Sequence, residues 1–486
     1  MILDKVLKAG FGSAAPFLGA RYARSWPIEG TMEHLGKGET LYWCFKRFGR
    51  PVELPEAGWG IAERFRPLPA SRSEAGRPRF LPPSVPAGFT AEARANLVCA
   101  GDILATQAAT QAATQAVTQA VTQAATQAAQ AAPQTSLPGA PQAGPAAIDG
   151  LLADIAPQLA AADLVCANLE SPVAPSRPAA GLPPKSWLKP LRLNHDPALA
   201  GRLLGQAVGL VSAANNHALD QGPEGLLETM DFLEERGCAY VGCARSAAAQ
   251  ARPVITDLGG IRVAHMAWTF SLSNKQIPPG RAYLVNYLRL NQPAVDLAPL
   301  RCQVEAARAA GADIVVAHLH WGLEYEAYPN HILIENAHRV IEAGVDVIVG
   351  NHPHQVQPWE WHAYTPPGAD AAAQGSRVGL ILYALGDFAS FQRGLPAPAY
   401  LSALAGIGLA KGRDAAGAER AWVCGLDPVP LFPFAVYQGR RCRDFRMLDL
   451  SRLAAAGFEC ALAGYGRRHR RLARRLWDQA ARARLR

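Results

Sequence analysis

From residue 97 to residue 385 the chain alternates short apolar runs with amphipathic helical patterns, and this alternation restricts the possible folds most strongly. The apolar runs have the length of buried strands. Helices are expected at 223–236, 300–310 and 332–343, where apolar residues recur on one face and a glycine follows. Strands that alternate with helices predict an α/β core. The strands are expected at 97–100, 163–167, 208–213, 261–267, 313–319, 345–349 and 380–385.

Side chains that can bind metal lie at or just after the carboxyl end of six of these seven runs. Ligands of open α/β sheets bind at that edge, so these side chains are expected to converge. Carboxylates, amide oxygens and imidazoles form a mixed oxygen and nitrogen set, which suits Mn, Fe or Zn better than Ca. A structural zinc site would use thiolates instead. The residues are Asp102, Asn168, Glu170, Asn215, Asn216, His217, His320, His352, His354 and Asp387.

Each of these residues alone carries little weight, because each type has a common structural role. An aspartate at a strand end is more often a helix cap than a ligand. A lone histidine in an apolar strand, such as His265 or His318, usually packs in the core. The pair His352 and His354 is more informative, because it follows a buried strand and a glycine. If that segment stays extended, both rings face one centre.

Three regions are expected along the chain. Residues 1–95 are aromatic and rich in proline, and their pattern indicates no function. Residues 96–395 hold the α/β pattern, interrupted at 105–147 by an Ala/Thr/Gln repeat and a linker. The repeat has a period of four, so no apolar stripe stays on one face of a helix, and a flexible low-complexity insertion is expected. Residues 396–486 form a C-terminal region that ends in an arginine-rich helix.

The net charge of +8 comes entirely from the tail, because residues 461–486 contain nine arginines and one aspartate. The rest of the chain is formally neutral, which argues against a general basic surface for nucleic acid. Residues 466–486 are expected to form a basic helix, with Leu472, Leu476 and Trp477 as apolar contacts. This helix fits either a solvated terminal helix or a surface that binds anionic lipid or an anionic polymer.

The cysteines and the N-terminus bear on location. Nine cysteines, an odd number without a CxxC pair, favour a reducing compartment. Cys99, Cys166 and Cys302 lie in apolar or helical patterns, where cysteine is usually a small buried hydrophobe. The mild stretch at 9–20 is interrupted by glycine and proline and makes a poor signal peptide, and no apolar run has the length of a spanning helix. A cytoplasmic or membrane-peripheral location is therefore expected.

Six segments of the chain resemble, in order, those of the capsule-synthesis CapA, or poly-γ-glutamate synthesis, proteins. The combination of NNHxxDxG, HWGxEY and GxHPHxxQ at residues 215–222, 320–325 and 350–357 makes the resemblance specific. It implies a calcineurin-like metallophosphoesterase sandwich, an α/β fold of mixed sheets flanked by helices. The segments are LVCAGDIL, ADLVCANLESPV, SAANNHALDQGPEGLLETMDFL, ADIVVAHLHWGLEY, AGVDVIVGNHPHQVQPWE and LILYALGDFASF, and they span residues 96–395.

The resemblance further implies a centre of divalent metal, with two ions of Mn, Fe or Zn. The implied metal ligands are Asp102, Glu170, Asn216, His320, His352 and His354. His217 matches the histidine that stabilises or protonates the reacting oxygens. The residues expected to line or brace the site are Asn168, Asn215, Asp220, Trp321, Glu324, Tyr325 and Asp387.

The sequence departs from the family pattern at three positions. Asn351 stands where histidine is frequent, and Asp387 stands where asparagine is common, which adds a negative charge near the site. Asp102 is followed by Ile103 and Leu104, so the Asp-x-His of many related phosphatases is missing. One of the two metals is therefore expected to lack a ligand, which leaves a site for one metal as an alternative.

Three functions remain open at this stage. The first is a metal-dependent hydrolase of the phosphoesterase type, linked to synthesis of a capsule or a polymer like poly-γ-glutamate. The second is a non-catalytic component that binds an anionic polymer within a capsule synthesis or export complex. The third is a degenerate member with an empty site. The expected partners are a phosphoester or anionic polymer substrate, capsule synthesis proteins and, through residues 464–486, the membrane surface.

Overall fold

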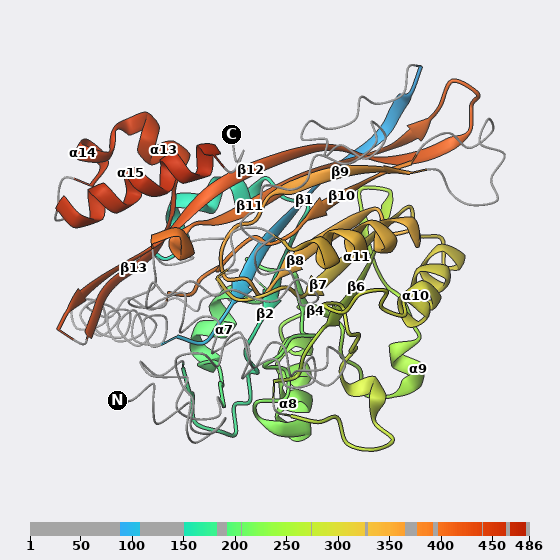
Figure 1. The fold of residues 1–486 in the computed structure, drawn as a ribbon, viewed down its shortest axis with the longest axis horizontal. Coiled ribbons are helices and arrows are strands. Elements are labelled where there is room, and N and C mark those ends of the chain that lie inside the picture. The colour runs from blue at the N-terminus through green and yellow to red at the C-terminus, as the bar shows by residue number, and fades with distance from the viewer. Residues whose placement is uncertain are drawn as a thin grey trace, which may run out of the picture.

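The computed structural model consists of two β-sheets with helices on their outer faces (Figure 1). Most of the expected N-terminal region, nearly all of the Ala/Thr/Gln insertion and parts of the tail lie outside the described residues. The structure describes residues 88–106, 150–181, 192–205, 207–273, 275–325, 329–364, 377–391, 397–439, 441–462 and 467–482.

The first sheet has seven strands and is organised around β1 (Thr90–Ile103). On one side of β1, the strands β2, β3 and β4 run parallel to it. On the other side, β1 pairs with β11 in antiparallel register, which places Leu97 opposite Ile407. The order is β13 (Arg441–Asp449), β12 (Glu419–Gln438), β11 (Ser402–Arg413), β1, β2 (Leu164–Leu169), β3 (Leu210–Ser212) and β4 (Ala239–Val241).

The second sheet has six strands, of which the inner four are parallel and the two edge strands are antiparallel. Parallel neighbours end at the same edge, so the functional side chains that follow them lie together. The order is β5 (Val254–Leu258), β6 (Ile261–Thr269), β7 (Ile314–His320), β8 (Val347–Asn351), β10 (Arg377–Leu382) and β9 (Trp359–Tyr364).

Alternate residues of the strands pack into different layers of the core. On β7, Ile314 and Val316 face the core between the two sheets, whereas Val315 and Ala317 pack under the helices of the outer face. The longer helices that cover the sheets are α7 (Pro197–Leu203), α8 (Gly222–Glu234), α10 (Ala298–Ala309) and α11 (His331–Glu342). The short ones are η5 (Ala153–Ile155), α6 (Ala156–Ala160), α9 (Ala247–Gln250), η7 (Ala282–Leu284) and η8 (Ala397–Tyr400).

The expected α/β elements are confirmed. Each of the seven predicted strands overlaps a strand of the structure, and the three predicted helices are α8, α10 and α11. The glycines after these helices, Gly237, Gly311 and Gly344, have φ of 63°, 81° and 104°. Glycine adopts these left-handed values without a steric penalty, which ends each helix where the sequence predicted.

The C-terminal region continues the first sheet. The predicted division at residue 395 places β1 and β11 in different regions, although the two strands are hydrogen-bonded neighbours in one sheet. Beyond β13, α13 (Leu450–Ala456), α14 (Phe458–Ala461) and α15 (Arg467–Arg482) form a helical group beside β12 (Figure 1). Among the described residues, no helix combines the length and hydropathy needed to cross a membrane.

Candidate metal centre

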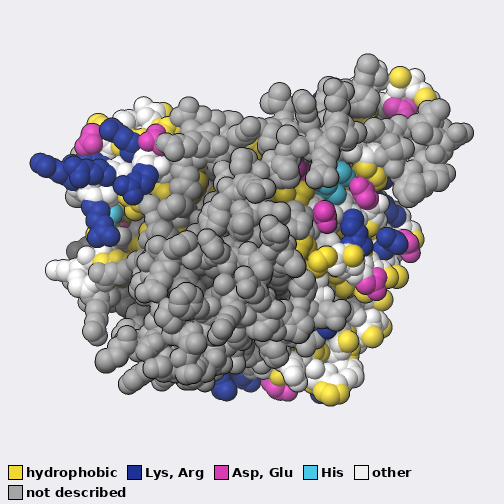
Figure 2. Space-filling view, in the orientation of Figure 1, with side chains coloured by type: hydrophobic (Ala, Val, Ile, Leu, Met, Phe, Trp, Pro, Cys, Tyr) yellow, Lys and Arg dark blue, Asp and Glu magenta, His cyan; other side chains and the backbone are white. Residues whose placement is uncertain are grey.

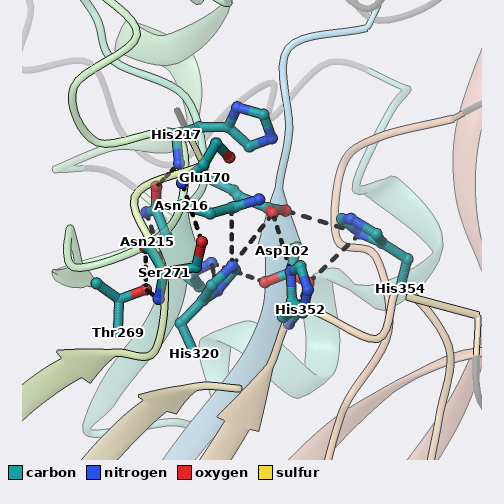
Figure 3. Close-up of polar contacts among 12 residues, drawn as sticks. Asp102, Glu170, Asn215, Asn216, His217, Thr269, Ser271, His320, His352 and His354 are labelled. Carbon is teal, nitrogen blue, oxygen red and sulfur yellow. Dashed lines mark hydrogen bonds and ion pairs between the residues drawn. The ribbon is translucent and has the colours of Figure 1, made fainter. Parts of the chain in front are cut away.

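Six buried side chains from both sheets meet where the carboxyl ends of the strands converge (Figure 3). Asp102 lies near the end of β1, Glu170 follows β2, and Asn216 lies in the loop after β3. His320 ends β7, and the remaining two histidines follow β8. We call this set, Asp102, Glu170, Asn216, His320, His352 and His354, the rim cluster.

Asp102 connects the two sheets through its backbone and its carboxylate. Its N–H donates to the carbonyl of Gly386 at 2.9 Å, and its carbonyl accepts from Phe388 N–H at 2.8 Å. Its carboxylate accepts from Asn168 Nδ2 at 2.7 Å and from the backbone N–H of His352 at 3.0 Å. A Cβ on the preceding Gly101 would lie 1.8 Å from the carbonyl oxygen of Gly386, so only glycine permits this approach.

The Glu170 carboxylate is fully buried, yet neither of its oxygens accepts a hydrogen bond of ordinary geometry within the part of the chain that the structure describes. Imidazole nitrogens surround it instead. Its Oε1 lies 3.4 Å from His320 Nε2 and 4.0 Å from His352 Nδ1, and its Oε2 lies 3.7 Å from His354 Nδ1. A buried carboxylate without donors is costly unless a cation neutralises it. This geometry therefore fits a metal ion between Glu170 and the imidazoles.

His320 is held by two amide side chains. Its Nε2 lies 3.0 Å from Asn216 Oδ1, and its Nδ1 lies 3.3 Å from Asn168 Nδ2. An amide oxygen accepts and an amide NH₂ donates, so the pairing corresponds to a neutral ring with its proton on Nε2. Burial lowers the pKa of His320 to about 3, which keeps the ring neutral. A neutral imidazole is the form that binds metal.

His352 and His354 reach the centre through a bend. The condition considered for this pair, an extended segment, is not met, because the two residues have φ of 97° and 53°. Both values lie in the left-handed region, which costs of the order of 1 kcal/mol or more for a residue with a Cβ. The bend places the ring centroids of His352 and His354 6.1 Å apart, with His352 also 4.7 Å from His320.

Asp387 joins the rim cluster through His354. Its Oδ1 lies 2.8 Å from His354 Nδ1, and Asp102 Oδ2 lies 3.5 Å from the same nitrogen. Burial opposes a positive charge on His354, but Glu170, Asp387 and Asp102 outweigh it and hold the pKa of this imidazole well above its usual value. His354 is therefore a protonated ring whose positive charge balances the neighbouring carboxylates. A bound cation would take over this role.

The two central carboxylates differ in acidity. Burial, reinforced by the Glu170 and Asp387 carboxylates, raises the pKa of Asp102 to about 8. Burial also acts to raise the pKa of Glu170, but His354, His320 and His352 outweigh it and hold that pKa well below its usual value. The cluster of acids and imidazoles thus retains protons that a bound cation would displace.

Two overlapping groups have ligand atoms within 4.8 Å of one another. One consists of Glu170, His352 and His354, and the other of Asp102, His354 and Asp387. Carboxylate oxygens and imidazole nitrogens are common ligands of Mn, Fe and Zn. The rim cluster is therefore a candidate metal site on its donor set as well as on its unpartnered carboxylate.

His217 lies beside the rim cluster and is oriented by an acid. Its Nδ1 is 2.9 Å from Asp220 Oδ2, which also accepts from Leu193 N–H at 2.8 Å. The second oxygen of Asp220 pairs with Lys275. Burial acts to raise the pKa of Asp220, but His217 and Lys275 outweigh it and lower that pKa. An ionised Asp220 accepts the proton on Nδ1 of His217. This leaves Nε2 as the ring nitrogen that can contact a bound molecule.

The remaining predicted residues occupy different surroundings. Asn215 donates to the Leu169 carbonyl at 2.7 Å and lies beside Asn168. Tyr325 places its ring 5.7 Å from that of His354, and Glu324 is half-buried in the same turn. Trp321 packs in the core under α10 and α11, and its Nε1–H donates to the Tyr383 carbonyl at 3.1 Å. Trp321 therefore supports the end of β7 from the side that faces these helices.

Sequence reasoning missed two residues at the site. Phe270 stacks against the rim cluster, with its ring centroid 4.8 Å from that of His352 and 6.4 Å from that of His320. Lys275 neutralises Asp220 from the loop after β6. An aromatic residue at a strand end and a lysine in a loop are too common to mark a site, and no spacing motif contains either residue.

Comparison with known proteins identifies the family of the chain. The family model described as bacterial capsule synthesis protein PGA_cap matches residues 96–392, more than half of the chain. A capsule biosynthesis protein CapA of Bacillus anthracis is 28% identical over 184 residues, which are 37% of this chain and 39% of that protein. A PGA biosynthesis protein CapA of Bacillus subtilis (strain 168) is 27% identical over 243 residues, which are 49% of this chain and 56% of that protein.

The matches therefore span about half or less of the length of these curated relatives. A solved structure described as a novel phosphatase from Mycoplasma pneumoniae aligns with 10% identity and a TM-score of 0.34, over 70% of this chain and 94% of that one. The match to the family model covers every residue of the rim cluster. The chain belongs to the bacterial capsule synthesis protein family, PGA_cap.

Proposed function

We propose that the rim cluster binds divalent metal and hydrolyses a phosphoester bond in the synthesis of a capsule or a polymer like poly-γ-glutamate. The observation that carries this proposal is the buried Glu170 carboxylate, which has three imidazoles within 4.0 Å and accepts no hydrogen bond of ordinary geometry from the described residues. Such a carboxylate is suited to bridge two cations, which a hydrolase of this type uses together.

The donor set divides into two parts that share Glu170. His320, Asn216 and His352 surround one side of Glu170, whereas Asp102, His354 and Asp387 surround the other. Asp387 would supply the ligand that the missing Asp-x-His leaves open. We infer two ions of Mn, Fe or Zn, held by these oxygen and nitrogen atoms.

The chemistry divides between the metal and the chain. When bound, the ions would polarise a phosphoryl oxygen and activate the attacking water. His217 would hold a proton at Nε2 for the leaving oxygen, because Asp220 accepts the Nδ1 proton and stabilises the charged ring. Phe270 and Tyr325 would exclude bulk water from beside the imidazoles.

The test is metal analysis of the full chain, purified without a histidine tag, together with a panel of chromogenic phosphomonoesters and phosphodiesters. We expect stoichiometric Mn, Fe or Zn and hydrolysis that Asp102→Ala and His352→Ala abolish. Glu228→Gln, a partly exposed acid of α8 outside the cluster, is the control and should leave both properties intact. Full activity in metal-free protein would overturn the proposal.

A second candidate function is binding of an anionic polymer without turnover, and α15 is the observation that favours it. Ala473 and Leu476 of this helix are buried, whereas its opposite face exposes five arginines (Figure 2). None of the five has an ionic partner among the residues that the structure describes. They are Arg467, Arg468, Arg471, Arg474 and Arg475.

Changing these five arginines to glutamine tests this candidate better than deletion of the helix, which would expose the core. Binding to poly-γ-glutamate that survives His352→Ala but fails in the glutamine variant would support a polymer-binding role. Binding that is unchanged in the glutamine variant would refute it. Flotation with vesicles of anionic lipid tests the membrane-peripheral location in the same variants.

A further inference from the structure

A second cluster of metal-ligating side chains lies in the core between the two sheets, below the rim cluster. Cys166 is two residues before Asn168 on β2, and His318 is two residues before His320 on β7. Alternate strand residues face the same side, so both side chains point into the space between the sheets. Two residues of a strand span about 7 Å, which sets the separation of the two levels.

Four residues form this level, which we call the inner cluster: Cys99, Cys166, His265 and His318. All are buried, with at most 3% of any of them exposed. Ligand atoms of Cys166, His265 and His318 lie within 4.8 Å of one another. Cys99 is opposite Cys166 in the register of β1 and β2, and both side chains pack in the core between the two sheets. The cluster therefore brings one sulfur and two imidazole donors together, and the thiol of Cys99, on the neighbouring strand, is the candidate fourth donor.

Two nitrogens of the inner cluster are unsatisfied. His265 Nε2 pairs with Thr256 Oγ1 at 3.1 Å, but His265 Nδ1 and His318 Nε2 have no hydrogen-bond partner in the ranges that the structure describes. The two rings lie 5.8 Å apart and nearly parallel, at 25°. A buried polar atom without a partner costs about 1–3 kcal/mol, so a ligand that engages both nitrogens would recover this energy.

We propose that the inner cluster is a second metal site, separate from the rim cluster, which binds a borderline-soft divalent cation such as Zn²⁺. Two cysteines and two histidines are the donor set of closed, tetrahedral structural zinc sites. Two thiolates and two neutral imidazoles give a neutral complex with Zn²⁺, and an apolar core tolerates a neutral complex far better than a net charge. The set contains no carboxylate, which disfavours Ca²⁺ and Mg²⁺.

One member of the inner cluster lines a cavity through which a metal would enter. A cavity of about 50 Å³ is lined by His265, Cys243, Asn286 and Gln250, at the side of the first sheet that ends in β4. Loading during folding is the alternative route, since β1, β2, β6 and β7 must come together to form the site. The bound metal would tie the two sheets together directly beneath the rim cluster.

Cobalt distinguishes the two sites, because the rim cluster contains no sulfur. The full chain is unfolded with a chelator, refolded and titrated with Co²⁺, whose bonds to thiolates give a charge-transfer absorption band in the near ultraviolet. We expect this band in wild-type protein and in His352→Ala, which disrupts only the rim cluster. Cys302→Ser with Cys460→Ser, which removes two exposed thiols, should keep it.

We expect Cys166→Ser to lose the thiolate band, and His265→Gln, the second variant in case the first does not fold, to lose the tetrahedral visible bands as well. Absence of a thiolate band in refolded wild type would overturn the proposal, and so would an undiminished band in Cys166→Ser. Either result would leave the proposed hydrolase unaffected, because its metal is counted separately in the Cys166→Ser variant with Mn²⁺.

Discussion

The rim cluster and the inner cluster occupy successive levels of the same strands but contain different chemistry. Residues 168 and 320 contribute an amide and an imidazole at the rim, whereas residues 166 and 318 contribute a thiol and an imidazole below it. Within the described ranges, carboxylate oxygens of the rim cluster and imidazole nitrogens of the inner cluster lack hydrogen-bond partners. The comparison teaches that one pair of facing strands can present a harder and a softer set of donor atoms two residues apart.

The largest effect is expected from Glu170→Gln, which removes the charge at the centre of the rim cluster and keeps its shape. Hydrolysis should fall by about 10³-fold, and bound metal should fall with it, since an amide is a weaker ligand than a carboxylate. Steady-state kinetics and metal analysis of the same sample measure both. Retained metal and activity would mean that the rim cluster is not the site of the chemistry.

His217→Gln separates the residues that bind metal from the residue that handles the proton. Hydrolysis should fall by about 10²-fold, because a general acid contributes at least this much. Bound metal should stay at the level of wild type, since His217 belongs to neither group of candidate ligands at the rim. Loss of metal in this variant would instead make His217 a ligand, and would enlarge the rim cluster.

His195, a buried imidazole outside both clusters, is expected to make the free energy of unfolding depend on pH in the acid range. Burial lowers the pKa of His195 to about 4, from 6.5. The unfolded chain therefore binds the proton first, and stability is lost as the pH falls from about 6.5 to about 4. The loss amounts to roughly 3 kcal/mol. In His195→Leu, measured by denaturant unfolding, the loss of unfolding free energy between pH 6.5 and pH 4 should be smaller than in wild type by that amount. An equal loss in the two proteins would contradict this prediction.

The smallest effect is expected from Thr256→Val, which removes the hydroxyl that pairs with His265 Nε2. The free energy of unfolding should fall by about 1 kcal/mol in metal-free protein, which is the net contribution of one such hydrogen bond. Thr256→Ser keeps the hydroxyl and is the matched control. A loss in Thr256→Ser with none in Thr256→Val would show that the methyl group, and not the hydrogen bond to the inner cluster, stabilises the protein.

The sequence predicted the parallel strands and the rim cluster well, because both follow simple rules. Short apolar runs bounded by helices are buried parallel strands, and polar residues after them meet at one edge. The bend at His352 was not predictable in the same way. Glycine is the strongest signal of a left-handed backbone in a sequence, and here two histidines adopt it under the constraint of their surroundings.

Strand β12 was missed because it contains three prolines, which normally exclude a central strand. The structure resolves the conflict by offsetting the two partners. Pro428 and Pro430 lie where β12 pairs with β11, and Pro433 lies where β12 pairs with β13. Each proline therefore lies opposite a residue of one neighbouring strand only. Each can then lack its N–H without breaking both ladders. A local pattern does not contain such an offset.

The inner cluster was interpreted from the sequence as ordinary core. Cys99, Cys166, His265 and His318 are separated by dozens of residues and form no spacing motif. They come together only because β1 and β2 face β6 and β7 across the sandwich. Long-range strand pairing decides this contact, and no signal in a window of the sequence reports it.

The backbone pairing of Asp102 with residues 386–388 has a consequence for biosynthesis. The backbone partners of Asp102 are synthesised only after nearly three hundred further residues, and β11, which flanks the same strand, follows them. During this interval a nascent chain carries the acids and imidazoles of the rim cluster unassembled. The donors of the proposed metal site can therefore come together only after residue 388 has been made.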